Sequence, residues 1–169
     1  MTTQKILKTN LALLPLLPSM TLEPERSPAP KKTPLQGKTM KTWNEFDGNT
    51  LFNRAFTKPI KISKIKLFQI TIDNNRPNIT FEFDIPEIPD SAPEKWIKMG
   101  FNTCRIGLSC NGVKELFLKN IPTQASLTIK IEKIDEYFLI RAENESSLLE
   151  FKTKYPLLCG PSVYMSTHE

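Results

Sequence analysis

The chain has 169 residues and a formal net charge of +5, and this length suits one domain with a substantial core. Residues 1–40 hold six of the 23 basic and two of the 18 acidic residues, a net charge of +4, which leaves the rest of the chain near neutrality at +1. This distribution excludes the basic domain that is typical of nucleic-acid-binding proteins. No apolar run reaches the roughly 18 residues that a membrane-spanning helix needs, so we expect no membrane partner.

Residues 1–40 lack a periodic hydrophobic pattern and hold six of the 14 prolines, which predicts a disordered, polyproline-like basic tail or linker. Residues 1–20 imitate a signal peptide, but Pro15 and Pro18 break the apolar run and no small-residue cleavage site follows. A real extension, a weak export signal and a start assigned too early, with Met40 opening the domain, all stay open. We assign residues 41–169 to one folded domain.

The folded domain opens near Trp43 with a short helix. Asp47 or Asn49 can cap this helix, and Pro59 requires that it end by about Phe56. The residues expected on its buried side are Leu51, Phe52, Ala55 and Phe56.

Segment 60–72 is rich in β-branched residues but changes phase part-way, which predicts a strand with a β-bulge near Leu67 and Phe68. Residues 73–78 form a turn cluster, so segment 79–85 returns antiparallel. Apolar and polar residues alternate strictly along segment 79–85, which is typical of a strand with one buried face.

A long excursion follows this strand. Pro86, Pro89 and Pro93 cannot donate to a sheet ladder, so the strand ends and a stiffened loop begins. The loop contains a short amphipathic run at residues 94–96 and leads into the next strand at Asn102. A loop of this kind between two strands suits contact with a partner.

Segment 103–110 is the next predicted strand, and Asn111-Gly112 after it is a strong hairpin signal. A three-residue turn with Gly112 in the left-handed conformation would pair Ile106 with Leu116 and Cys104 with Leu118, which keeps the apolar side chains on one face. Further strands are predicted at residues 125–131, 137–143, 148–155 and near 161–165.

These segments predict a mainly β fold: a single antiparallel β-meander of seven or eight strands, forming a sandwich or a curved, partly open barrel, with one short N-terminal helix. The positions expected to point into its core are Phe81, Phe83, Ile106, Leu108, Leu127 and Ile129.

Reaction chemistry is not visible in the sequence. The single histidine, His168, is the penultimate residue, and no glycine-rich phosphate loop is present, so we expect no enzymatic activity and no cofactor. Cys104, Cys110 and Cys159 form no metal-binding or disulfide pattern, and Cys104 and Cys110 share a strand face with apolar residues. We expect no bound metal and a reducing, cytoplasmic setting.

Two groups of charged residues have a functional and a purely structural interpretation. Asp84, Glu87, Asp90 and Glu94 recur every three or four residues and are either solvated loop charges or an acidic rim for a basic partner; calcium-loop spacing is absent. Lys58, Lys61, Lys64 and Lys66 form a basic stripe that either contacts phosphates or protects an edge strand from pairing with other chains. The edge-protection interpretation is favoured for the stripe.

The order of several features resembles a known family. Trp43-Asn44-Glu45-Phe46, a short Leu/Phe helix, the stretch FDIPEIPDSAPEKW over residues 83–96 and the strand pair NTCRIGLSCNGVKELFLKN are similar to the immunity protein 50 family of bacterial polymorphic-toxin systems. The resemblance covers about residues 43–155 and excludes the N-terminal tail. It implies a cytoplasmic antitoxin that binds and neutralises a cognate toxin encoded beside it.

For such a protein we expect the excursion to contact the toxin through Glu87, Asp90, Glu94, Lys95 and Trp96. The alternative from another functional class is a small-ligand or glycan-binding β-module in which Trp43 or Trp96 forms a stacking platform. Both tryptophans also suit the hydrophobic core. The sequence does not identify the toxin or the oligomeric state.

Overall fold

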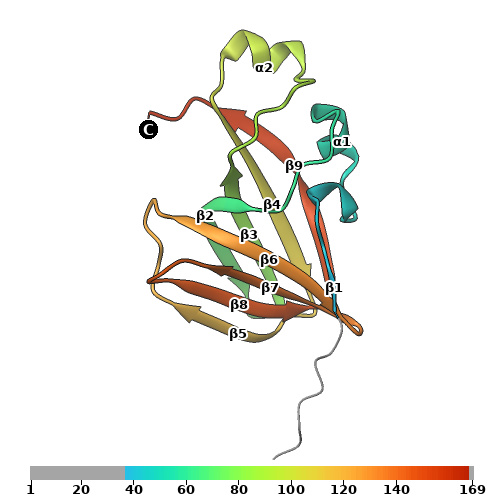
Figure 1. Ribbon diagram of the computed structural model, residues 1–169, viewed down its shortest axis with the longest axis vertical. Coiled ribbons are helices and arrows are strands. Elements are labelled where there is room, and N and C mark those ends of the chain that lie inside the picture. The colour runs from blue at the N-terminus through green and yellow to red at the C-terminus, as the bar shows by residue number, and fades with distance from the viewer. Residues whose placement is uncertain (1–36, 168–169) are drawn as a thin grey trace, which may run out of the picture. The chain divides into compact units, whose positions relative to one another are not determined.

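The computed structural model describes residues 37–167 of the chain (Figure 1). The elements in chain order are β1 (Lys38–Thr39), the 3₁₀ helix η1 (Trp43–Glu45), α1 (Thr50–Ala55), β2 (Lys64–Asp73), β3 (Asn78–Ile85), α2 (Glu94–Met99), β4 (Thr103–Asn111), β5 (Lys114–Lys119), β6 (Ser126–Ile134), β7 (Tyr137–Glu143), β8 (Leu148–Thr153) and β9 (Tyr155–Tyr164).

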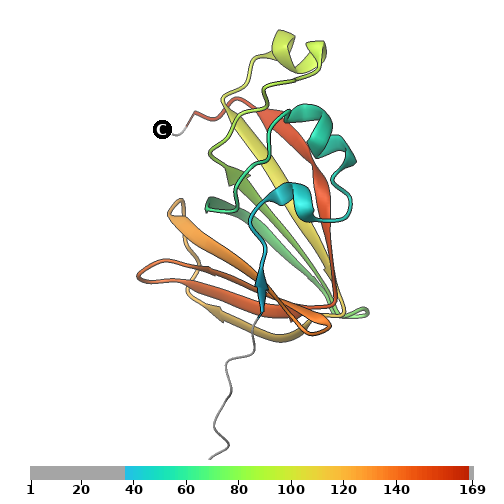
Figure 2. The same cartoon turned by 45° about the vertical axis from the view of Figure 1, so that its right-hand side comes forward.

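The described strands form one open antiparallel sheet, which confirms the predicted mainly β class. The strand order is β5-β8-β7-β6-β2-β3-β4-β9, and the short β1 pairs with β6. Strand β2 joins the two halves: residues 64–66 pair with β6, and from Lys66 onward the strand pairs with β3. The register with β3 shifts between Leu67 and Gln69, so the predicted bulge is present at the point where β2 turns from one half to the other (Figure 2).

The core is filled by the alternating apolar residues of these strands. On β3 the side chains of Ile79, Phe81, Phe83 and Ile85 are buried, and the intervening residues are half-buried. All six residues predicted to face the core have less than a few per cent of their surface exposed. The alternation of apolar and polar residues therefore predicted correctly which face of each of these strands is buried.

The predicted short helix is present as α1, with Asn49 as its N-cap residue. Phe52, Ala55 and Phe56 are buried, but Leu51 is 58% exposed, so its predicted burial is wrong. Positions 52, 55 and 56 are three and four residues apart and therefore share one helix face, whereas Leu51 lies about 100° away from Phe52 around the helix.

The predicted pairing of the strand after Gly112 is also wrong. Gly112 has the expected left-handed conformation, with a φ of 65°. However, β5 pairs with β8, and the second neighbour of β4 is β9. Strand β9 has ten residues and pairs along almost the whole of β4, with Pro156 and Leu158 buried, whereas every residue of β5 is exposed. The longer strand with a buried face is the better partner for a central strand.

The sheet begins slightly earlier than the predicted domain. Residues 38 and 39 form β1, and Met40 is buried with its backbone N–H donating to the carbonyl of Ile131 at 2.9 Å. The last residues assigned to the tail therefore belong to the sheet. The remainder of that predicted tail, residues 1–36, lies outside the described residues.

Candidate functional site

The excursion, residues 86–101, interrupts the sheet between β3 and β4 and projects at one end of the molecule (Figure 1). The predicted amphipathic run at residues 94–96 is the first part of a second helix, α2, which continues to Met99. Gly100 ends the helix with a φ of 69°, a conformation that favours glycine.

Hydrogen bonds hold the excursion at both ends. The Asp90 carboxylate accepts from the backbone N–H of Thr57 at 2.8 Å and from its hydroxyl at 2.6 Å. The Ser91 N–H donates to the carbonyl of Ala55 at 3.0 Å, so the first half of the excursion is attached to the end of α1. At the other end Asn102 exchanges two hydrogen bonds with the backbone of Ser166. The excursion is therefore ordered before any partner arrives.

The predicted site residues have different roles in this arrangement. Asp90 is a structural attachment and not a free rim charge, and the two hydrogen bonds from Thr57 lower the pKa of its carboxyl. Glu87 is half-buried, and among the described residues its Oε2 atom has no hydrogen-bond partner. Trp96 is half-buried and packs against the core.

Glu94 and Lys95 are both exposed on α2. Glu94 forms an ion pair with Lys98 at 3.3 Å, but both side chains are highly exposed, so the pair stabilises the helix only slightly.

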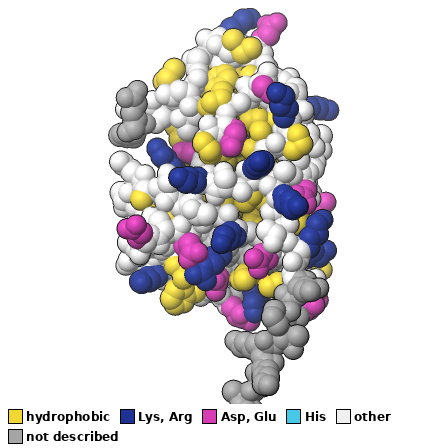
Figure 3. All heavy atoms as spheres, viewed as in Figure 1, with side chains coloured by type: hydrophobic (Ala, Val, Ile, Leu, Met, Phe, Trp, Pro, Cys, Tyr) yellow, Lys and Arg dark blue, Asp and Glu magenta, His cyan; other side chains and the backbone are white. Residues whose placement is uncertain are grey.

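Exposed apolar residues on the excursion are the feature that sequence reasoning missed. Ile97 and Met99 on α2 are 63% and 67% exposed, and Ile88 is also exposed. Met165, beyond the end of β9, is exposed beside Gly100. Figure 3 shows hydrophobic side chains at the end that carries α2, with basic and acidic groups at its tip. A signal was available: Ile97 and Met99 lie on either side of Trp96 around the helix and the three together span about 160°, which is wider than the roughly 100° stripe that a helix buries against a core.

A cleft of about 740 Å³ is lined by Pro86 at the start of the excursion and by Asn102 just beyond its end. One wall is a network in which the Asp84 carboxylate accepts from Arg105 Nε at 2.8 Å and from the Tyr164 hydroxyl at 2.6 Å. The Arg105 guanidinium lies 3.3 Å from the centre of the Phe68 ring. Burial and the hydrogen bond to Asp84 raise the pKa of Tyr164 to about 12, so the Tyr164 hydroxyl keeps its proton at neutral pH.

The lysine stripe reaches this cleft. Lys64 and Lys66 line it, and neither has an acidic partner within the described part of the chain. At Lys66 β2 is paired on both sides, with β6 and with β3, whereas Lys64 is paired with β6. Lys66 therefore does not protect a sheet edge, and the favoured interpretation of the stripe from sequence is wrong at this position.

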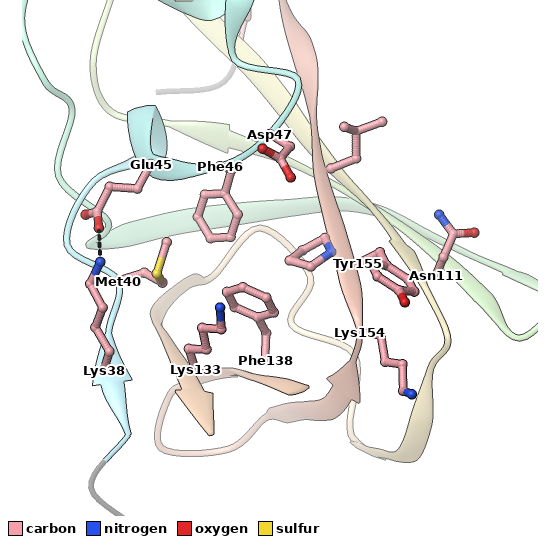
Figure 4. A pocket seen from close by; sticks show the side chains of 12 residues that line it. Lys38, Met40, Glu45, Phe46, Asp47, Asn111, Lys133, Phe138, Lys154 and Tyr155 are labelled. Carbon is pink, nitrogen blue, oxygen red and sulfur yellow. Dashed lines mark ion pairs between the residues drawn. The ribbon is translucent and has the colours of Figure 1, made fainter. Parts of the chain in front are cut away.

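A second cleft, of about 490 Å³, lies between β1, η1, β7 and β9 (Figure 4). Its floor includes Met40, Phe46 and Phe138, and Tyr155 stands exposed at its edge. Lys38 at the rim pairs with Glu45 at 3.6 Å. The size and the mixture of apolar floor and polar rim are typical of small-molecule sites.

The groups that could support reaction chemistry are mostly inaccessible. Burial raises the pKa of the Cys104 and Cys110 thiols to about 12, so neither is a ready nucleophile. Within residues 37–167 no group of three or more His, Cys, Asp or Glu side chains could hold a metal ion, and no helix there is long and apolar enough to cross a membrane. His168 lies outside the described residues.

Trp43 cannot form a stacking platform for a ligand. It is 1% exposed and packs against the rings of Phe46 and Phe83, with centroid separations of 6.1 and 5.1 Å. Its role is in the core, which leaves Trp96 as the remaining one of the two tryptophans that the ligand-binding alternative named as a possible platform.

Comparison with known proteins agrees with the resemblance seen in the sequence. The family model described as immunity protein 50 matches residues 48–164, which include the helix α1, the excursion and all strands from β2 to β9. No curated protein and no solved structure matched the chain. The chain belongs to the immunity protein 50 family.

Proposed function

We propose that this protein is a cytoplasmic immunity protein that binds the toxin of a bacterial polymorphic-toxin system and neutralises it by occlusion. Family membership supports the class. The single structural observation that carries the proposal is the excursion, an ordered projection with exposed Ile97 and Met99 at its surface. Exposed apolar side chains on an ordered segment are costly in water unless a partner covers them.

The proposed mechanism uses steric cover and requires no reaction. Ile97 and Met99 enter an apolar depression on the toxin, and Glu94 and Lys95 at the rim of the contact adjust the association rate. The hydrogen bonds of Asp90 and Asn102 fix the excursion in advance, which lowers the entropy lost on binding.

Paired substitutions test the proposal. Ile97→Asp combined with Met99→Asp is expected to weaken binding to the co-purifying toxin by at least about 100-fold, because the contact loses its apolar centre. Ile72→Asp is the matched control, since Ile72 is equally exposed but lies on β2 outside the excursion. If the control weakens toxin binding and the α2 variant does not, the toxin contacts another face.

The cleft between β1, η1, β7 and β9 supports a second candidate, a small-ligand or glycan-binding module in which the exposed Tyr155 would be the stacking ring (Figure 4). A glycan array probed with the wild type and with Tyr155→Ala tests it. This candidate would be favoured over the first if the wild type binds a glycan, Tyr155→Ala does not, and the protein binds no toxin.

A further inference from the structure

Strand β5 and the residues just after it carry a dense group of exposed apolar residues. Leu116, Phe117, Leu118 and Ile121 are between 41% and 76% exposed, and they fall within six consecutive residues. Strand β5 lies at the opposite end of the molecule from α2 (Figure 1). The toxin contact proposed above therefore leaves this surface uncovered.

Strand β5 is also an uncovered end of the sheet. It pairs with β8 along one side, and no strand among the described residues pairs with its other side. The opposite end of the sheet, β9, contacts α1 and pairs with the chain at Asp47, whose carbonyl accepts from the N–H of Leu158 at 2.8 Å. Unpaired backbone groups beside apolar side chains favour the addition of another strand.

The sequence of β5 is complementary to itself in the antiparallel direction. When two copies meet about a two-fold axis through Phe117, Glu115 lies opposite Lys119 of the second copy, Leu116 lies opposite Leu118, and the two Phe117 rings are neighbours. Opposite charges and apolar pairs at facing positions stabilise antiparallel strands, and the symmetry repeats the Glu115–Lys119 and Leu116–Leu118 contacts.

The pairing of β5 with β8 is regular over residues 117–119 and is compatible with this register there, and its register shifts between Lys114 and Phe117. Phe117 lies opposite Glu150, whose side chain is on the outer face, and Leu118 lies opposite the buried Leu149. In the two-fold register Leu116 therefore joins Leu118 of the second copy on the core side, and the Phe117 rings meet on the outer side.

Irregular backbone limits the length of the contact. Glu115 and Asn120 both have a φ of 55°, so the extended part of β5 is the stretch between them. The Glu115 carboxylate already pairs with Lys152 at 2.6 Å, but it is largely exposed and can accept from a second lysine. A short strand with turned ends pairs once and does not extend into an open aggregate.

We propose that β5 docks on β5 of a second copy of this chain, giving a two-fold symmetric dimer with a continuous sheet. The excursion at the other end of each copy stays accessible. Dimer formation and toxin binding are therefore separable, and either can fail without the other.

A charge exchange tests the register. Sedimentation equilibrium of the full chain is expected to show a dimer. Lys119→Glu places two carboxylates opposite each other at both ends of the contact, and Glu115→Lys places two ammonium groups there; each is expected to raise the dimer dissociation constant about tenfold. The double variant restores both opposite-charge pairs and is expected to return within about threefold of the wild type.

Two further variants complete the test. Lys114→Glu makes the same charge change one residue outside the proposed ion pair, so it is expected to change the dissociation constant by less than about threefold. Phe117→Asp is expected to give a folded monomer whose melting temperature does not depend on protein concentration, because the ring is exposed in a single copy.

A wild type that stays monomeric at about 100 µM would overturn the proposal, since standard specific interfaces are stronger than that. A double variant as weak as the single variants would overturn the register and with it the proposed contact between the two β5 strands. If the wild type is monomeric and Phe117→Asp abolishes toxin capture, the occupant of β5 is the toxin and not a second copy.

Discussion

The buried aromatic residues show how individual side chains hold the two parts of this sheet to the N-terminal segment. Phe83 on β3 lies between Phe81, with a centroid separation of 4.7 Å, and Trp43 of η1, at 5.1 Å. It therefore joins the central sheet to a segment that precedes it by forty residues. Aromatic pairs in contact stabilise a core beyond their buried area.

Phe83→Ala is expected to lower the free energy of unfolding by about 3–5 kcal/mol, because it leaves a cavity in contact with two other rings. The midpoint of urea denaturation measures this change. Ile72→Ala, at an exposed position, is the control and is expected to change the free energy by less than about 0.5 kcal/mol. Equal midpoints for the wild type and Phe83→Ala would show that the ring is not packed as described.

Asp90 gives a prediction about pH. Hydrogen bonds from Thr57 lower its pKa in the folded protein below the usual value of 3.8, so the carboxylate stabilises the fold fully above that value and loses its contribution as the pH falls through the lower folded pKa. The stability difference between the wild type and Asp90→Asn is therefore expected to be constant near neutral pH and to shrink below about pH 4.

Thermal melts of both proteins between pH 7 and pH 2.5 measure this difference. Thr57→Ala removes the hydroxyl donor and is expected to flatten the pH dependence by itself. A difference that grows with acidity would contradict the assignment of Asp90 as an attachment of the excursion.

At the scale of elements, α2 divides its apolar residues between two roles. Trp96 packs against the core, whereas Ile97 and Met99 face solvent. A six-residue helix is too short to be stable alone, so the contacts of Trp96 and the attachments of the excursion must hold it in place. Positions 96 and 97 are adjacent, yet their substitution should have different consequences.

Trp96→Ala is expected to cost about 1–3 kcal/mol of stability and to weaken toxin binding as well, because it removes half-buried area beneath the helix. Ile97→Ala is expected to weaken toxin binding with a stability change below about 0.5 kcal/mol. Toxin affinity and melting temperature measured on the same preparations separate the two effects. Equal loss of stability in both variants would mean that α2 packs on its other face.

At the scale of the whole molecule, the sheet turns at the β2 bulge. The edge that β6 would otherwise expose is completed by β1 and Met40, at the N-terminal end of the domain. Residue pairs Lys38–Lys133 and Thr39–Glu132 add β1 to β6. The edge of β6 beyond its short pairing with β2 is thereby covered. This strand of two residues is easily overlooked because it has no alternating pattern.

A chain that begins at residue 41 is expected to be less stable than one that begins at residue 37 by about 2–4 kcal/mol, because it loses the buried Met40 side chain and the hydrogen bonds of β1. Chemical denaturation of the two proteins gives the comparison. The variant Met40→Ala in the longer chain separates the side-chain contribution from that of the backbone. Identical stability of the two truncated chains would show that β1 contributes nothing.

The sequence by itself determined the fold class, the faces of β3, β4 and β6, and the bulge in β2. These features are local: a period of two places alternate side chains on one face of a strand whatever its partner is. The resemblance carried by residues 83–96 likewise identified the family, which the match over residues 48–164 confirms.

Only the tertiary structure decided which strand is the neighbour of β4, that Asp90 is bound to Thr57, and that Ile97 is exposed while Trp96 packs against the core. Each of these depends on contacts between residues far apart in the chain, such as the 33 positions between Thr57 and Asp90. Periodicity specifies a face but not the partner that covers it, because many pairings bury the same face equally well and the choice rests on the packing of the whole sheet.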